Sequence, residues 1–209
     1  MNINPPPILL ATTNHGKIRE FRSLLAGVPC HCITPDELGI KLDVKETGDT
    51  YAENARLKAL AYLAASRLPV LADDTGLEVD ALDGAPGLHS ARFSDQPGAT
   101  DADRRAKLLR VLADKPRPWL ARFRCVVAVA VPSRDTSLFE GTVEGEIITE
   151  ERGEHGFGYD RLFYILAAGR TLAELRTSDK NVFSHRAMAV KKAIPYLLEI
   201  LKKNSGNVI

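Results

Sequence analysis

The sequence lacks the features that would place its 209 residues in a membrane, secreted or disulfide-rich class. It contains no apolar run near the roughly 20 residues that cross a bilayer, so we expect no transmembrane helix and no membrane partner. Residues 1–7 lack the positive region and the apolar stretch of a secretory signal. Three cysteines cannot all pair with one another, which argues against a disulfide framework. These absences predict a protein of the reducing cytoplasm.

The cysteines also give little support for a metal site. Cys30 and Cys32 flank His31, but a structural zinc site needs about four ligands, and no second cluster follows in the sequence. Cys125 lies within an apolar run, so we expect it to be a small residue of the core.

A strong excess of one charge is absent as well, because 28 basic and 27 acidic residues leave a net charge of +1. A general nucleic-acid binder needs a basic surface, so we expect no nucleic-acid partner, although a local basic pocket for a small anion is compatible with this balance. The length suits one sizeable core, or two lobes around a shared one, and we predict a single domain over residues 1–209.

The hydrophobic pattern alternates strand-like and helix-like segments, which predicts an α/β fold with a mixed sheet. We expect strands at residues 8–11, 69–72, 77–82, 123–131, 138–149 and 162–165. Helices are expected directly after the first strand and up to Gly27, from residue 49 or 50 to 67, at 101–113, and from the Ser184-His185-Arg186 run through Leu201. Asp73-Asp74-Thr75-Gly76 is expected to end the second of these strands. In the third helix Arg105 is expected to face outward, and Pro195 predicts a kink or a break in the last helix.

The first segment with chemical potential is Thr12-Thr13-Asn14-His15-Gly16-Lys17, where the first strand meets the first helix. Free backbone N–H groups and the helix dipole at such a turn favour a phosphate, and a lysine adds positive charge. The alternative is an Asn14 N-cap beside a solvated Lys17.

Two acidic segments could hold a metal. One carboxylate of the Asp73-Asp74 pair could bind Mg²⁺ or take a proton from water, because successive side chains of a continuing strand point to opposite sides. Glu46, before Gly48, could complete the site. The alternatives are a turn at Asp73–Gly76, capped by its own side chains, and a surface position for Glu46.

Two later segments could bind a base. In Gly156-Phe157-Gly158-Tyr159-Asp160 the glycines could expose an aromatic ring for stacking, and Asp160 could bond a polar base edge. The alternative is a tight turn with both rings in the core. Lys180 and the run Ser184-His185-Arg186 could clamp phosphates or a base oxygen, or could instead be a Ser184 N-cap followed by exposed basic residues. Taken together, the segments predict a nucleoside triphosphate site.

In these residues the chain resembles the inosine triphosphate/xanthosine triphosphate pyrophosphatases, which remove nonstandard purine nucleotides. The matching motifs, in order, are Thr12-x-Asn14-x-x-Lys17, Glu46-Thr47-Gly48-x-Thr50-x-x-Glu53-Asn54-Ala55, Ala72-Asp73-Asp74-Thr75-Gly76-Leu77, Gly84-Ala85-Pro86-Gly87-x-x-Ser90-Ala91-Arg92-Phe93, Gly156-Phe157-Gly158-Tyr159-Asp160 and Lys180-x-x-x-Ser184-His185-Arg186. Two positions depart from the family pattern: Thr75 replaces a serine, and Arg161 replaces a proline.

The resemblance implies an elongated mixed sheet with flanking helices, two lobes around a central cleft, and a homodimer. It implies cleavage of ITP, dITP or XTP to the monophosphate and pyrophosphate. Asp74 would activate water and bind Mg²⁺ together with Glu46, and residues 12–17 would hold the triphosphate beside Thr75. Around the base it places Phe157, Gly158, Tyr159, Asp160, Lys180, His185 and Arg186.

Two other functions are alternatives to a purine nucleotide pyrophosphatase. A nucleotide-binding regulator could use the same pocket without turnover, but it has no need of a water-activating carboxylate. A pyrophosphatase for pyrimidine or modified nucleotides is the nearer alternative, and the base-binding segments favour purines mainly through the resemblance.

Overall fold

The computed structural model describes residues 5–205. Residues 1–4, which belong to the N-terminal segment expected not to be a secretory signal, lie outside the described residues. The strands are β1 (Pro7–Leu10), β2 (His31–Ile33), β3 (Val70–Val79), β4 (Pro86–Gly87), β5 (Trp119–Ala130), β6 (Ser137–Ile147), β7 (Phe163–Ile165) and β8 (Arg170–Thr171). The longer helices are α1 (His15–Leu24), α2 (Tyr51–Ser66), α3 (Asp101–Leu112), α4 (Thr177–Phe183) and α5 (His185–Ser205). None of the helices in this part of the chain combines the length and hydropathy of a membrane span.

The predicted mixed sheet is confirmed. Its strands follow the order β2-β1-β3-β5-β6-β7-β8, and β4 pairs with β3 outside this path. β1 pairs in parallel with β2 and with β3, whereas β7 pairs antiparallel with β6 and β8. The parallel register of β1 and β3 ends at Leu10 and Leu71, so β3 continues beyond the end of its neighbour.

The chain divides into two compact units. The first contains the described residues up to Asp74, then 125–141, and then Arg186 onward; the second contains 75–124 and 142–185. Each unit has a core of its own.

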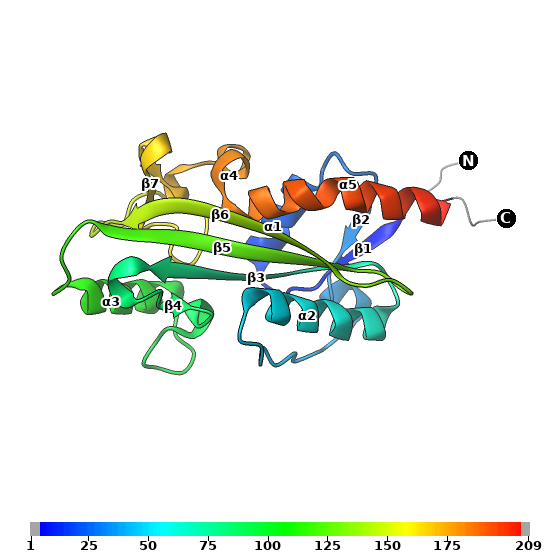
Figure 1. The fold of residues 1–209 in the computed structure, drawn as a ribbon, viewed down its shortest axis with the longest axis horizontal. Coiled ribbons are helices and arrows are strands. Elements are labelled where there is room, and N and C mark those ends of the chain that lie inside the picture. Colours follow the sequence, from blue (N-terminus) through cyan, green and yellow to red (C-terminus); the bar gives the residue numbers. More distant parts are fainter. Residues whose placement is uncertain (1–4, 206–209) are drawn as a thin grey trace. The chain divides into compact units, whose positions relative to one another are not determined.

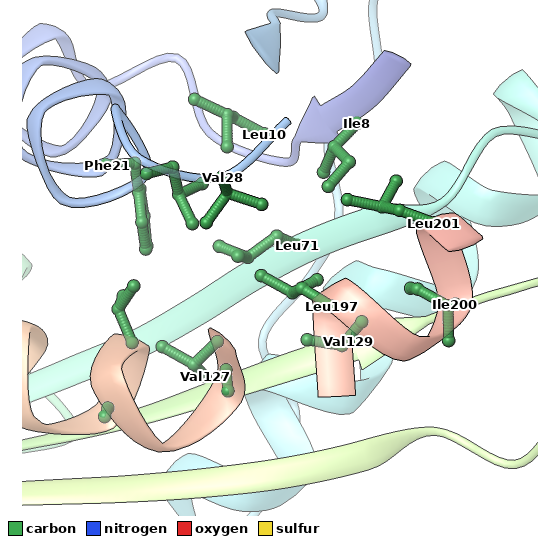
Figure 2. Close-up of a cluster of buried hydrophobic side chains, with 14 of the residues drawn as sticks. Ile8, Leu10, Phe21, Val28, Leu71, Val127, Val129, Leu197, Ile200 and Leu201 are labelled. Carbon is green, nitrogen blue, oxygen red and sulfur yellow. The ribbon is translucent and has the colours of Figure 1, made fainter. Parts of the chain in front are cut away.

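The core of the first unit lies between strands and two helices. Ile8 and Leu10 of β1, Leu71 of β3 and Val127 and Val129 of β5 meet Phe21 of α1 and Leu197 of α5, as Figure 2 shows. Within this unit α2 lies on the opposite side of the strands from α5 (Figure 1). Cys125 belongs to the buried cluster, as predicted.

The core of the second unit is more aromatic. Phe123 and Phe163 pack with their ring centroids 4.8 Å apart, and Trp119 and Tyr159 belong to the same buried cluster. Leu108 and Leu112 add the inner face of α3.

Capping residues fix where α2 and α3 begin. Thr50 caps α2 through its hydroxyl, which accepts from the Glu53 amide, while the Glu53 carboxylate accepts from the Thr50 amide. The reciprocal pair satisfies two amides that the helix itself cannot use. α3 begins with the same arrangement, formed by Thr100 and Asp103.

Three sequence predictions are wrong. β3 does not end at Asp73–Gly76 but continues to Val79, because both aspartates have cationic partners and Leu77 and Val79 return to a buried core. The break that was predicted as one outcome at Pro195 is absent, because α5 continues through this exposed residue. Arg105 does not face outward but is buried.

Candidate active site

The segment between β1 and α1 presents polar groups at the start of a helix. Asn14 is the N-cap, and its side chain accepts from the Lys17 amide at 3.0 Å, so the capping alternative is confirmed for this residue. Thr13, Asn14 and His15 are exposed, whereas Gly16 is buried, and Thr12 Oγ1 accepts from the Asn14 amide at 3.2 Å. The exposed residues at the N-terminal end of α1 are therefore accessible to an anionic ligand.

Lys17 is not a solvated lysine. Its Nζ lies 3.0 Å from Asp73 Oδ1, and only 17% of its side chain is exposed. The pair connects the first turn of α1 to the middle of β3, so the position of Lys17 depends on Asp73.

Asp73 and Asp74 have separate sets of partners because they are successive residues of a strand. Asp73 is buried and accepts from Lys17 and, at 2.9 Å, from Arg186 Nη2. Asp74 faces Lys58, whose Nζ lies 3.5 Å from Asp74 Oδ1. The turn proposed as an alternative for this segment is wrong, and the continuing strand divides the two carboxylates between two roles.

Asp73 belongs to a buried ionic network. Burial alone would raise the pKa of its carboxyl, but the charges of Lys17, Arg186 and Lys58 outweigh burial and hold the pKa well below its ordinary value. Arg186 also bonds the buried Glu20. These contacts direct the Arg186 guanidinium into the interior of the first unit.

Glu46 and Asp74 share one cation. Lys58 Nζ donates to Glu46 Oε1 at 2.7 Å and lies 3.5 Å from Asp74 Oδ1. The side chain of Asp74 is 10% exposed and that of Glu46 27% exposed, so the pair is sheltered but still in contact with solvent. The alternative, in which Glu46 is a surface residue without a structural role, is therefore wrong.

The loop that carries Glu46 is fixed against α2. The buried Asn54 accepts from the Gly48 amide at 2.8 Å through its side-chain oxygen. A Cβ at Gly48 would lie 2.5 Å from Glu53 Cβ, so only glycine fits this contact. Asn54 and Lys58 are four residues apart on one face of α2, so one helix face orients both the loop and its carboxylate.

The surroundings of Lys58, Glu46 and Asp74 favour an ionised Lys58 and raise the pKa of the Asp74 carboxyl. Burial raises the pKa of Asp74; the charge of Lys58 opposes this effect and that of Glu46 adds to it, and the net pKa is raised. For Lys58 burial lowers the pKa, but the carboxylates of Asp73, Asp74 and Glu46 outweigh burial and raise it.

The second unit holds the Gly156–Asp160 loop and Lys180. Asp160 is buried, and its Oδ2 accepts from the Phe157 amide at 2.9 Å and from Lys180 Nζ at 2.6 Å. The same ammonium lies 5.2 Å from the centroid of the half-buried Phe157 ring. Asp160 therefore fixes both the loop and the lysine.

Two other residues predicted near the base pack against residues of the core. Tyr159 is buried and its hydroxyl donates to the Ser90 carbonyl at 2.9 Å, which matches the alternative of a ring packed into the core. His185 is buried and stacks on Phe123 with centroids 4.7 Å apart. Thr75, half-buried, follows Asp74 directly on β3.

A family model described as the Ham1 family matches residues 8–196. The chain belongs to the Ham1 family. It is 49% identical over 190 residues to a dITP/XTP pyrophosphatase of Geobacillus kaustophilus, covering 88% of this chain and 91% of that one. It is 41% identical over 184 residues to the dITP/XTP pyrophosphatase of Bacillus subtilis, covering 88% and 93% of the two chains. The family resemblance predicted from the motifs is confirmed.

Solved structures support the same assignment. A HAM1 protein from Coxiella burnetii matches with a TM-score of 0.82 and 39% identity, covering 93% of this chain and 99% of that one. A nucleoside-triphosphatase / dITP/XTP pyrophosphatase from Mycobacterium abscessus matches with a TM-score of 0.70 and 35% identity, covering 91% and 99%.

For this Ham1 family member, sequence reasoning missed three participants. Lys58 was not singled out, although its spacing of four residues from Asn54 places both on one helix face. Glu20 lies on the expected polar face of the first helix and Arg105 was expected to face outward, but both are buried in ion pairs. No local pattern marks such residues, because their partners lie 166 and 46 positions away in the sequence.

Proposed function

We propose that this chain hydrolyses nonstandard purine nucleoside triphosphates, such as ITP, dITP and XTP, between the α- and β-phosphates. The products are the nucleoside monophosphate and pyrophosphate. The dITP/XTP pyrophosphatase activity of the Ham1 relatives supports the substrate class, and the chain's own carboxylates support the reaction type.

One observation carries the proposal: Lys58 lies between Glu46 and Asp74 and contacts both carboxylates. A protein that only binds nucleotide has no need of a carboxylate placed to activate water beside a second sheltered carboxylate. A hydrolase needs them, because a carboxylate can hold a cation that neutralises the phosphates and can take the proton of the attacking water.

The donor set fits Mg²⁺. Within residues 5–202 no group of three or more His, Cys, Asp and Glu residues could hold a metal. Magnesium, however, is commonly bound by one or two carboxylates, with phosphate oxygens and waters completing its shell. Glu46 and Asp74 would hold it, and when bound it would neutralise phosphate charge in the transition state.

The remaining groups of the first unit would bind and orient the triphosphate. The exposed residues Thr13, Asn14 and His15 and the start of α1 favour phosphate oxygens, and Lys17 adds a cation. Asp74 would accept the proton of the attacking water, a task that suits its raised pKa because the proton is held more tightly. Arg186 would hold Asp73, and through it Lys17, in place.

Base recognition would belong to the second unit. Phe157 is the ring proposed to stack on the purine, and Lys180 and His185 are proposed as donors to the 6-oxo group of hypoxanthine or xanthine. Adenine presents an amino group at that position and would leave a buried donor without an acceptor, at a cost of about 1–3 kcal/mol. Gly158, Tyr159 and Asp160 would hold the loop that carries Phe157 in place.

The test is a panel of nucleoside triphosphates with Mg²⁺, with monophosphate, pyrophosphate and orthophosphate measured separately. We expect ITP and XTP to give monophosphate and pyrophosphate much faster than ATP, GTP or the pyrimidine nucleotides. Equal rates on ATP and GTP would contradict the substrate class. Orthophosphate would contradict the cleavage position, and binding without products would favour the regulator.

A homodimer and a cytoplasmic location complete the proposal. Sedimentation of the purified chain tests the first, and fractionation of cells that express it tests the second.

A further inference from the structure

The loop residue Gly158 is held through both of its backbone polar groups by one helix. Its amide donates to Asp101 Oδ2 at 2.7 Å, and its carbonyl accepts from Arg105 Nη1 at 2.8 Å. Asp101 and Arg105 are four residues apart, so they lie on the same face of α3. We name these two side chains the α3 clamp.

The clamp is itself fixed. Arg105 is buried, and its Nε and Nη2 bond the two carboxylate oxygens of Glu151 at 2.7 and 3.1 Å. Asp101 pairs with Arg104. Burial would raise the pKa of Asp101, but the Gly158 amide and Arg104 outweigh it and lower the pKa, so the carboxylate is ionised. Bonds from ionised groups are stronger than bonds between neutral ones.

The clamp acts next to the proposed base-stacking ring. Phe157 is bonded through its own amide to Asp160, and the following residue, Gly158, is bonded to α3. Gly158 has φ +61°, a conformation that other residues rarely adopt. The ring is therefore carried by a short backbone segment with an anchor on each side.

Apolar packing does not replace this clamp. A polar cavity of about 220 Å³ borders the loop, and Asp101, Arg105, Phe157 and Arg161 are among the residues that line it. The loop thus faces a cavity on this side, where the hydrogen bonds from Asp101 and Arg105 hold its backbone.

We propose that Asp101 and Arg105 are positioning residues that fix Gly158 and thereby hold Phe157 against the base. This inference rests on the proposed function for the substrate, but the clamp itself can be measured without turnover. The side chains do not touch the reacting atoms. Their loss changes substrate binding rather than the chemical step.

Hydrogen exchange at the Gly158 amide tests the clamp directly. In the full chain without nucleotide, Asp101→Ala removes the acceptor and raises exchange in peptides spanning residues 156–160 by about tenfold or more. Asp101→Asn keeps a side-chain oxygen and restores most of the protection. Arg110→Met is the matched control, because Arg110 is exposed on the same helix and pairs with Asp95. Unchanged exchange in Asp101→Ala overturns the clamp.

Steady-state kinetics with ITP tests the consequence. Asp101→Ala and Arg105→Met raise KM about tenfold while kcat stays within about twofold, and Asp101→Asn recovers most of the loss. A fall in kcat at constant KM, or unchanged kinetics despite faster exchange, overturns the positioning role. If Arg105→Met fails to fold, as a thermal melt reveals, Arg105→Lys decides. A wild-type chain inactive on ITP would overturn the proposed function, while the exchange comparison would still decide the clamp.

Discussion

Lys58 Nζ lies 2.7 Å from Glu46 Oε1 and so connects α2 with the carboxylate of a neighbouring loop. Asp74 Oδ1 is 3.5 Å from the same ammonium. This lysine sets the charge felt by both carboxylates proposed for metal binding and water activation, which makes their titration a test of the site.

Replacing Lys58 shifts the pH dependence of kcat/KM. The proposed base must be deprotonated, so activity falls as the pH drops through the pKa of Asp74. Burial has raised that pKa, and the Lys58 charge opposes the rise. Lys58→Met removes this charge, and the acid limb of the kcat/KM profile therefore moves to higher pH.

Lys58→Arg is the control for this shift, because it keeps the positive charge and the acid limb stays close to that of the wild type. A limb that stays in place in Lys58→Met, or moves to lower pH, would show that Asp74 is not the titrating group.

Glu46→Gln weakens metal binding at the site without removing the proposed base. A neutral amide is a poorer ligand for Mg²⁺ than a carboxylate, so the Mg²⁺ concentration for half-maximal activity rises by about tenfold or more. Chelation with EDTA abolishes activity in both proteins, and excess Mg²⁺ restores it. Glu199→Gln is the control, because Glu199 forms an exposed ion pair with Arg134. This variant leaves the Mg²⁺ concentration for half-maximal activity unchanged. Equal Mg²⁺ dependence of Glu46→Gln and wild type would exclude Glu46 as a ligand.

Asp73→Asn is expected to lower the free energy of unfolding more than the control variant Asp95→Asn does. The Asp73 carboxylate is fully surrounded by Lys17 and the buried Arg186, and removing its charge leaves that guanidinium with less compensation. We expect a loss of about 3–5 kcal/mol in the free energy of unfolding, measured by urea denaturation. Asp95→Asn breaks only exposed ion pairs and is expected to leave the free energy of unfolding nearly unchanged. Losses of the same size in both variants would contradict the network.

Much of the fold followed from local pattern. The spacing of Ile18, Phe21 and Leu25 predicts the buried face of α1, and that of Ala55, Ala59 and Tyr62 predicts the buried face of α2. The extension of β3 through Asp73 and Asp74 could not be predicted, because two adjacent carboxylates resemble a turn until their cations are placed. β5 also begins earlier than expected, at Trp119: Arg122 interrupts the apolar run in the sequence, although Trp119, Ala121 and Phe123 alternate toward the core.

The candidate site was predictable where one segment carries the signal. The Asn14 N-cap was one of two interpretations of its segment, and the opposite orientation of Asp73 and Asp74 was predicted only for a strand that continues past them; both are found. The partners that fix them were not expected. Lys58 approaches Glu46 across 12 positions, and Arg186 approaches Asp73 across 113, so only the folded chain places them together.

The most direct test of the account is Asp74→Asn, compared with wild type on ITP and Mg²⁺. Wild type is expected to release IMP and pyrophosphate in equal amounts. The variant is expected to lose about 10²–10⁴-fold in kcat, the usual contribution of a general base, while calorimetry still detects ITP binding. Near-wild-type turnover by Asp74→Asn would contradict the central role of this carboxylate.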